Sequence, residues 1–118
     1  MNRGDLTRLA TLAAMKRDAD LQGLSAIAAR MATIQAEIDR VRAEASLRAG
    51  SAELDPSRMS GSDVMWERWI AGVLVRLQRQ MADLAVAREA YLQRARQSFG
   101  RAEALRTLEE RHDRDKKR

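Results

Sequence analysis

The sequence predicts an all-α protein made of two long helices that form an antiparallel coiled-coil hairpin. Two stripes of mostly apolar residues at alternating steps of three and four each place their members along one side of a helix. The stretch between them is rich in glycine and serine and holds the only proline. Such a stripe is stable only against a partner, and the nearest partner is the other half of the same chain. The first stripe is Ile27, Met31, Ile34, Ile38, Val41 and Ala45, and the second is Ile70, Leu74, Leu77, Met81, Leu84, Arg88, Tyr91, Ala95, Ser98, Ala102 and Leu105.

The first helix is expected over about residues 5–48, with Asp5 as its cap. Alanine, leucine, arginine and glutamate dominate this segment, and all four favour helix. Its first part is less regular than the rest, which predicts a stutter or a frayed first turn. The apolar face there drifts through Leu6, Leu9, Ala13, Lys16 or Arg17, Leu21, Leu24 and Ala28.

A loop is expected over about residues 49–62, where the three-and-four periodicity stops. The Asp55-Pro56 pair disfavours helix, and Gly61 interrupts what precedes the next cap. The second helix is then expected over about residues 63–112, followed by a charged tail over 113–118. Its two internal glycines, at positions 72 and 100, cost about 1 kcal/mol each relative to alanine, too little to end so long a helix. Residues 1–118 therefore form a single helical hairpin in this interpretation.

Composition limits what the chain can be. With 118 residues, 3% aromatic and 33% charged, it is one small domain at most, with too few large side chains for a globular core. No apolar run approaches the roughly 20 residues that span a bilayer. The first five residues already include the charged Arg3 and Asp5, and the N-terminal segment lacks the apolar run of a secretory signal. A cytosolic protein is expected, and the absence of cysteine agrees with that.

The charge balance is basic, with 22 lysine and arginine residues against 17 acidic residues. Most of the cations are arginine, which favours bidentate contacts with carboxylates or phosphates. The excess lies on the second helix and continues into the tail. An acidic protein surface and a nucleic-acid backbone are both admissible partners.

Catalytic residues are not evident. There is no cysteine nucleophile. The single histidine, His112, lies in a charged helical run, where a carboxylate three residues away, such as Glu109, often occurs by chance and does not indicate a metal site. The glycines form neither a phosphate-binding loop nor a dinucleotide fingerprint. We expect no enzyme activity, no catalytic residue, no metal, no cofactor and no small-molecule substrate.

The start of the second helix carries more apolar residues than one seam needs. A neighbouring stripe, rotated by one residue or about 100° from the seam, consists of Trp69, Val73, Arg76 and Gln80. In a two-helix hairpin this stripe is largely exposed, and its composition is typical of a protein-binding hot spot. The alternative is that Trp66 and Trp69 cover the hairpin tip beside Leu54 and Met59. The sequence leaves both interpretations open.

At these residues the sequence resembles the FliJ family, the small coiled-coil component of the flagellar type III export apparatus, with its injectisome counterparts. The pattern is two aromatic residues separated by two polar ones, followed by isoleucine, leucine and glutamine positions at helical spacing. In this chain it corresponds to Trp66, Trp69, Ile70, Leu74, Leu77 and Gln80. Residues 88–111 are similar to the charged C-terminal helix of that family. The likeness covers essentially the whole chain.

The resemblance implies a stalk similar to that of rotary ATPases, whose joined ends insert into a hexameric export ATPase. It also implies that the stripe of Trp69, Val73, Arg76 and Gln80 contacts the cytoplasmic domain of the export gate, with Trp66 at the hairpin tip. Members escort export chaperones as well. The expected location is the cytoplasm, at the cytoplasmic face of the inner-membrane export apparatus. The tail residues expected to face acidic loops of the ATPase channel are Arg106, Arg111 and Arg114.

The chain departs from the family pattern in three ways. It is shorter than typical members, Arg76 stands where a small apolar residue is usual, and Gly72 and Gly100 soften the second helix. One alternative is a generic coiled-coil adaptor or dimer in which the same seams pair between chains. Another is an arginine-rich nucleic-acid-binding protein, which the interspersed acidic residues and the lack of aromatic residues among the cations disfavour. The sequence does not distinguish a flagellum from an injectisome.

Overall fold

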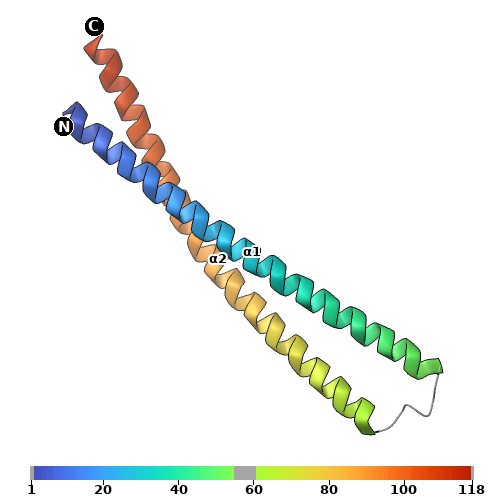
Figure 1. Cartoon of the computed structure of the whole chain (residues 1–118). Helices are drawn as coiled ribbons and strands as arrows, with labels where there is room; N and C mark the ends of the chain where they lie inside the picture. The colour runs from blue at the N-terminus through green and yellow to red at the C-terminus, as the bar shows by residue number, and fades with distance from the viewer. Residues whose placement is uncertain (1, 55–60, 118) are drawn as a thin grey trace. The chain divides into compact units, whose positions relative to one another are not determined.

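The protein is an all-α helical hairpin. The computed structural model describes residues 2–54 and 61–117, and within them the secondary structure consists of helix α1 (Arg3–Leu54) and helix α2 (Gly61–Lys116) (Figure 1). Both helices extend beyond the expected bounds. Helix α1 continues six residues past Arg48, and the expected tail is helical as far as Lys116. Of the expected loop, residues 49–54 and 61–62 are helical, and the rest lies outside the described residues.

The N-terminal cap differs from the expected one. Asn2 Oδ1 accepts a hydrogen bond from the Asp5 amide at 2.8 Å, and the Leu6 amide donates to the Asn2 carbonyl oxygen at 3.1 Å. Asn2 is therefore the capping residue, and Asp5 lies in the first turn, where its charge suits the positive end of the helix dipole. At the other end of the chain, Arg114 and Lys116 occupy the last turn of α2, where cations are favourable for the same reason.

The hairpin divides into two compact units, which are described separately. The loop-end unit is Ala29–Val86, and the terminal unit combines Met1–Ala28 with Ala87–Arg118. In each unit a segment of α1 packs antiparallel to a segment of α2. No described helix is long and apolar enough to cross a bilayer.

The loop-end unit has an aliphatic core that the sequence predicts correctly. A cluster of Ile38, Val41, Ile70 and Leu77 is buried between the helices. Flanking members of both predicted stripes complete it, together with a tryptophan and a valine from the start of α2. These flanking residues are Ile34, Ala45, Trp66, Val73 and Leu74.

The terminal unit has a core of smaller and more polar residues. The seam of α1 continues through this unit with strict steps of four and three, so the expected stutter is absent. Its members are Leu6, Ala10, Ala13, Arg17, Asp20, Leu24 and Ile27, all buried or half-buried. Leu9, Leu21 and Ala28, expected on this face, are exposed. The expected face named Arg17 as an alternative to Lys16 but missed Asp20, because a search for apolar spacing passes over a carboxylate.

The facing seam of α2 in the terminal unit matches its prediction except at Arg88. Ala95, Ser98 and Ala102 are buried, while Tyr91 and Leu105 are half-buried. Arg88, at the first seam position of this unit, is exposed. An ion pair between Arg3 and Asp113 joins the two helices near the chain ends. Small residues in these seams allow the helix backbones to approach closely, so this unit is stabilised less by apolar burial than a leucine-rich seam would be.

Candidate protein-binding face of helix α2

Trp66 belongs to the core of the loop-end unit. Its ring is half-buried against the aliphatic cluster, and the Arg48 guanidinium lies 4.2 Å from the ring centroid. Arg48 also donates to Asp63 Oδ1 at 2.9 Å, so one arginine from α1 contacts both an aromatic ring and a carboxylate of α2. These contacts hold the two helices together beside the loop. The expected neighbours Leu54 and Met59 have side chains outside the described part of the structure.

Trp69 lies on the outside of the same unit, with 64% of its surface exposed. Trp69 directly precedes the buried seam residue Ile70, and the step of one residue, about 100° around the helix, places the Trp69 ring outside the seam. The structure thus separates the two interpretations that the sequence left open: Trp66 packs on the core, and Trp69 does not. An exposed tryptophan on a regular helix is available for a partner.

The other members of the predicted stripe are not equally exposed. Arg76 and Gln80 are exposed, as expected for an outward face. Val73 is half-buried and packs against the aliphatic core cluster, so it anchors the edge of the stripe. A substitution at Val73 would therefore disturb both the core and the stripe.

Three further exposed residues beside Trp69 belong to the same face. Met65 is one turn before Trp69 and Gly72 is three residues after it, and neither packs on the other helix. Arg79 is the third of these residues and lies seven residues, or two helical turns, after Gly72. Spacing of three and four from Trp69 could have identified the first two, but an apolar-seam search has no reason to include a glycine.

The face around Trp69 is positively charged. Arg68, Arg76 and Arg79 are exposed and form no ion pair with any described residue. Such arginines keep their hydrogen-bonding capacity for carboxylates of another molecule. This face combines an aromatic anchor with free guanidinium groups, a composition that suits a protein partner with acidic residues around an apolar pocket.

The predicted tail residues have different surroundings. Arg106 donates to Glu103 at 2.5 Å and also pairs with Glu110, so its charge is already compensated within α2. These contacts raise the pKa of Arg106, mainly through the hydrogen bond to Glu103. Arg111 and Arg114 are exposed and have no ion-pair partner among the described residues. Of the three, these two remain available to an acidic surface.

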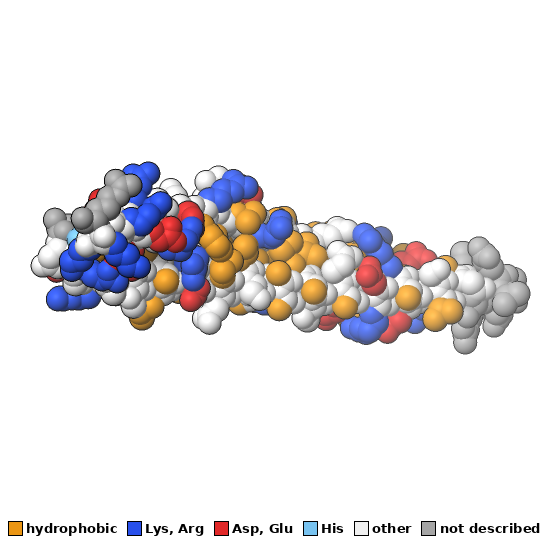
Figure 2. Space-filling model, turned by 90° about the horizontal axis from the view of Figure 1, so that it is seen from above, with side chains coloured by type: hydrophobic (Ala, Val, Ile, Leu, Met, Phe, Trp, Pro, Cys, Tyr) orange, Lys and Arg blue, Asp and Glu red, His pale blue; other side chains and the backbone are white. Residues whose placement is uncertain are grey.

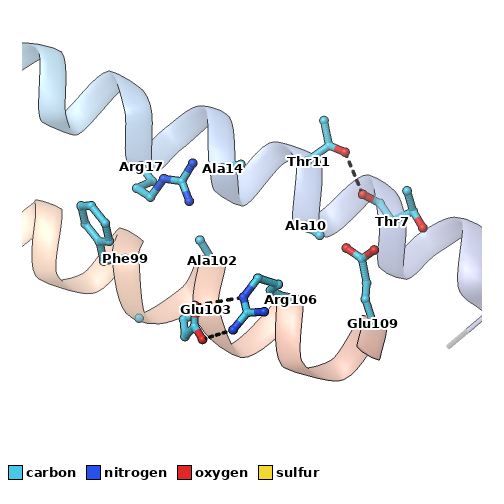
Figure 3. Close-up of a pocket in the computed structure, with 11 residues that line it drawn as sticks. Thr7, Ala10, Thr11, Ala14, Arg17, Phe99, Ala102, Glu103, Arg106 and Glu109 are labelled. Atoms are coloured by element: carbon cyan, nitrogen blue, oxygen red, sulfur yellow. Dashed lines mark hydrogen bonds and ion pairs between the residues drawn. The ribbon is translucent and has the colours of Figure 1, made fainter. Parts of the chain in front are cut away.

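A shallow groove lies between the helices in the terminal unit. It has a volume of about 690 Å³, and its floor contains alanines from both helices, including Ala10, Ala14 and Ala102. Arg17 lies beside Phe99 with 5.8 Å between guanidinium carbon and ring centroid, and Glu103 and Arg106 pair with each other at its margin (Figure 3). The groove follows from the small seam residues. Its charges are mixed, so it does not select one class of ligand.

Charged side chains surround the chain ends of the terminal unit. In the space-filling view, lysine and arginine gather there, whereas apolar side chains are scattered along the remainder of the visible face (Figure 2). Over residues 2–54 and 61–117, no group of three or more His, Asp or Glu side chains is arranged to hold a metal ion. Comparisons of this chain with models of protein families, with curated proteins and with solved structures find no match.

Asp20 is a buried charge that the sequence interpretation missed. Only 4% of its surface is exposed, and Oδ1 accepts a hydrogen bond from Lys16 Nζ at 2.8 Å. The hydrogen bond from Lys16 lowers the pKa of this carboxyl below its ordinary value of 3.8; the nearby Ser98 hydroxyl and the charges of Lys16 and Arg94 act in the same direction, and burial opposes them. Oδ2 is buried without a partner among the described residues. The seam therefore contains a carboxylate that must stay ionised to keep its contacts.

Acid is expected to destabilise the protein through Asp20. Because the folded-state pKa is lower than the unfolded-state value, the contribution is fully present above pH 3.8 and is lost as the pH falls from there through the folded-state pKa. Urea unfolding between pH 2.5 and 7 should show this loss in the native chain, and Asp20→Asn should flatten it. An unchanged acid slope in Asp20→Asn would mean that other carboxylates, such as Glu103 beside Arg106, determine the acid response.

Proposed function

We propose that this chain is a non-enzymatic coiled-coil component of a type III protein export apparatus. The observation that carries the proposal is the exposure of Trp69 on the helix face that the resemblance assigns to export-gate contact. Arg76 and Gln80 accompany it on that face, while Trp66 packs inside. In this proposal the face of α2 around Trp69 binds the cytoplasmic domain of the export gate.

The terminal unit would contact the hexameric export ATPase. The exposed Arg111 and Arg114 supply cations at the chain ends, and acidic loops of an ATPase channel are a complementary surface. A stalk of this kind needs a defined helix pairing rather than reactive groups, and the cross-helix contacts of both units provide it. Escort of export chaperones, and a location at the cytoplasmic face of the inner membrane, belong to the same proposal.

The test is binding to purified partners from the source cell. The gate's cytoplasmic domain and the export ATPase are titrated separately against the intact chain, Trp69→Ala and a control, Gln78→Ala. Gln78 is an exposed residue of the same helix and unit, and its spacing of nine residues from Trp69 places it on the opposite side of α2. We expect Trp69→Ala to weaken gate binding while ATPase binding stays constant, and Gln78→Ala to alter neither. If the intact chain binds neither protein, the proposal is wrong.

A further inference from the structure

The terminal unit contains two adjacent layers whose members cannot be exchanged for one another. In the first, Asp20 of α1 and Ser98 of α2 are both 4% exposed in the seam. The Ser98 hydroxyl donates to the Arg94 carbonyl oxygen at 3.0 Å, and rotation of the hydroxyl toward Asp20 would supply Oδ2 with a donor. Burial of a carboxylate is costly unless the carboxylate receives hydrogen bonds, and a hydroxyl is one of the few small side chains that can donate one.

The second layer is a steric fit between Gly23 and Tyr91. A Cβ atom at position 23 would lie 2.3 Å from Tyr91 Cε1 and 2.8 Å from Cδ1. The aromatic ring therefore occupies the space that any other residue of α1 would fill. Arg94, one turn further along α2, lies 5.0 Å from the ring centroid and holds its outer side.

The aliphatic core of the loop-end unit cannot distinguish alignments in this way. Ile38, Val41, Ile70 and Leu77 are similar in size and polarity, so a slip of one heptad replaces one aliphatic neighbour with another. Seams of this kind also pair readily between chains. Discrimination between alignments of the two helices must therefore come from layers in which an incorrect neighbour lowers stability.

A slip of one heptad would break both layers of the terminal unit at once. Asp20 would face Tyr91 or Leu105 instead of Ser98, and the tyrosine ring would meet Lys16 or Arg30 instead of the glycine. A parallel pairing of two α1 helices from different chains would place Asp20 against its own copy. Two carboxylates facing each other in a seam repel, and one must take up a proton.

We propose that Asp20, Gly23, Tyr91 and Ser98 form a register lock, which restricts the chain to one intramolecular alignment and suppresses pairing between chains. The inference does not depend on the proposed function. A single buried polar residue that fixes register and oligomer state has precedent in coiled coils generally.

The lock is tested with Asp20→Leu, which fills the seam position with an apolar residue and should leave helicity intact. The matched control is Asp18→Leu. It removes the same charge from an exposed site that lies two residues before Asp20. Tyr91→Leu combined with Asp20→Leu removes both layers. Self-association is measured by sedimentation velocity, and alignment by electron paramagnetic resonance between nitroxides at exposed positions 22 and 93. Because the chain has no cysteine, the two labelling sites are unambiguous.

We expect Asp20→Leu to self-associate about tenfold more tightly than the native chain or to show a second, longer distance, because a slip of one heptad shifts the two labels by about 10 Å along the helix axis. The double variant should show the larger effect. Dilution with unlabelled chain separates distances within a chain from distances between chains. The lock is refuted if Asp20→Leu and the double variant remain monomeric with one native distance. It is equally refuted if Asp18→Leu changes association as much.

Discussion

Replacing Gly23 with alanine is expected to destabilise the protein, although alanine is the better helix former by about 1 kcal/mol. The added Cβ would lie 2.3 Å from Tyr91 Cε1, so the aromatic ring must leave its position between the helices. Overpacking of this kind costs about 1–3 kcal/mol, and a rigid ring has few alternative rotamers. A net loss of up to about 2 kcal/mol in the free energy of unfolding should follow, measured by urea denaturation followed by circular dichroism.

Two other glycines provide matched controls within the same chain. Gly72 and Gly100 are helical residues of α2, and a Cβ at either position would meet nothing within 4 Å. Alanine there gains helix propensity without a clash, so each substitution should raise stability by up to about 1 kcal/mol. Opposite signs at position 23 and at these two positions would identify the contact with Tyr91 as the cause. Stabilisation by Gly23→Ala would contradict the fit between the two residues.

The aliphatic seams were predictable because their physical basis is local. Each member from Ile27 to Ala45 and from Ile70 to Leu84 is an apolar residue at a step of three or four, and all are buried or half-buried as expected. The terminal part of α1 was not predictable in the same way. Its seam includes Arg17 and Asp20, which a hydrophobic pattern excludes, and only the facing small residues of α2 make room for them. Their burial is a property of the helix pair, not of one helix.

The candidate site was predictable in position and not in detail. The sequence identified the stripe through Trp69, but the placement of Trp66 depends on Arg48, which comes from the other helix. Whether an arginine is free to bind another molecule also depends on its neighbours. Arg106 forms ion pairs with Glu103 and Glu110, whereas Arg76 has no ion-pair partner among the described residues. Single-helix patterns carry no information about such pairs across the hairpin.

The two tryptophans are expected to respond to substitution in opposite ways. Trp66→Ala removes a half-buried ring from the aliphatic core and leaves Arg48 without its aromatic contact. Full burial of a tryptophan would put the cost of truncation at about 3–5 kcal/mol, and half-burial reduces it to about 2 kcal/mol. For a chain of this size the melting temperature should fall by about 8 °C.

Trp69→Ala should leave stability within about 0.5 kcal/mol of the native value, because the ring is mostly exposed. Its effect is expected in binding: loss of an aromatic hot spot costs about 2 kcal/mol, which weakens the affinity for the export-gate domain about 30-fold. Thermal unfolding and titration calorimetry on both variants separate the two roles. A large loss of stability in Trp69→Ala would place that ring in the core. If Trp69→Ala leaves the affinity for the gate domain unchanged, the exposed ring does not contact the gate, and the face around Trp69 is not the binding site.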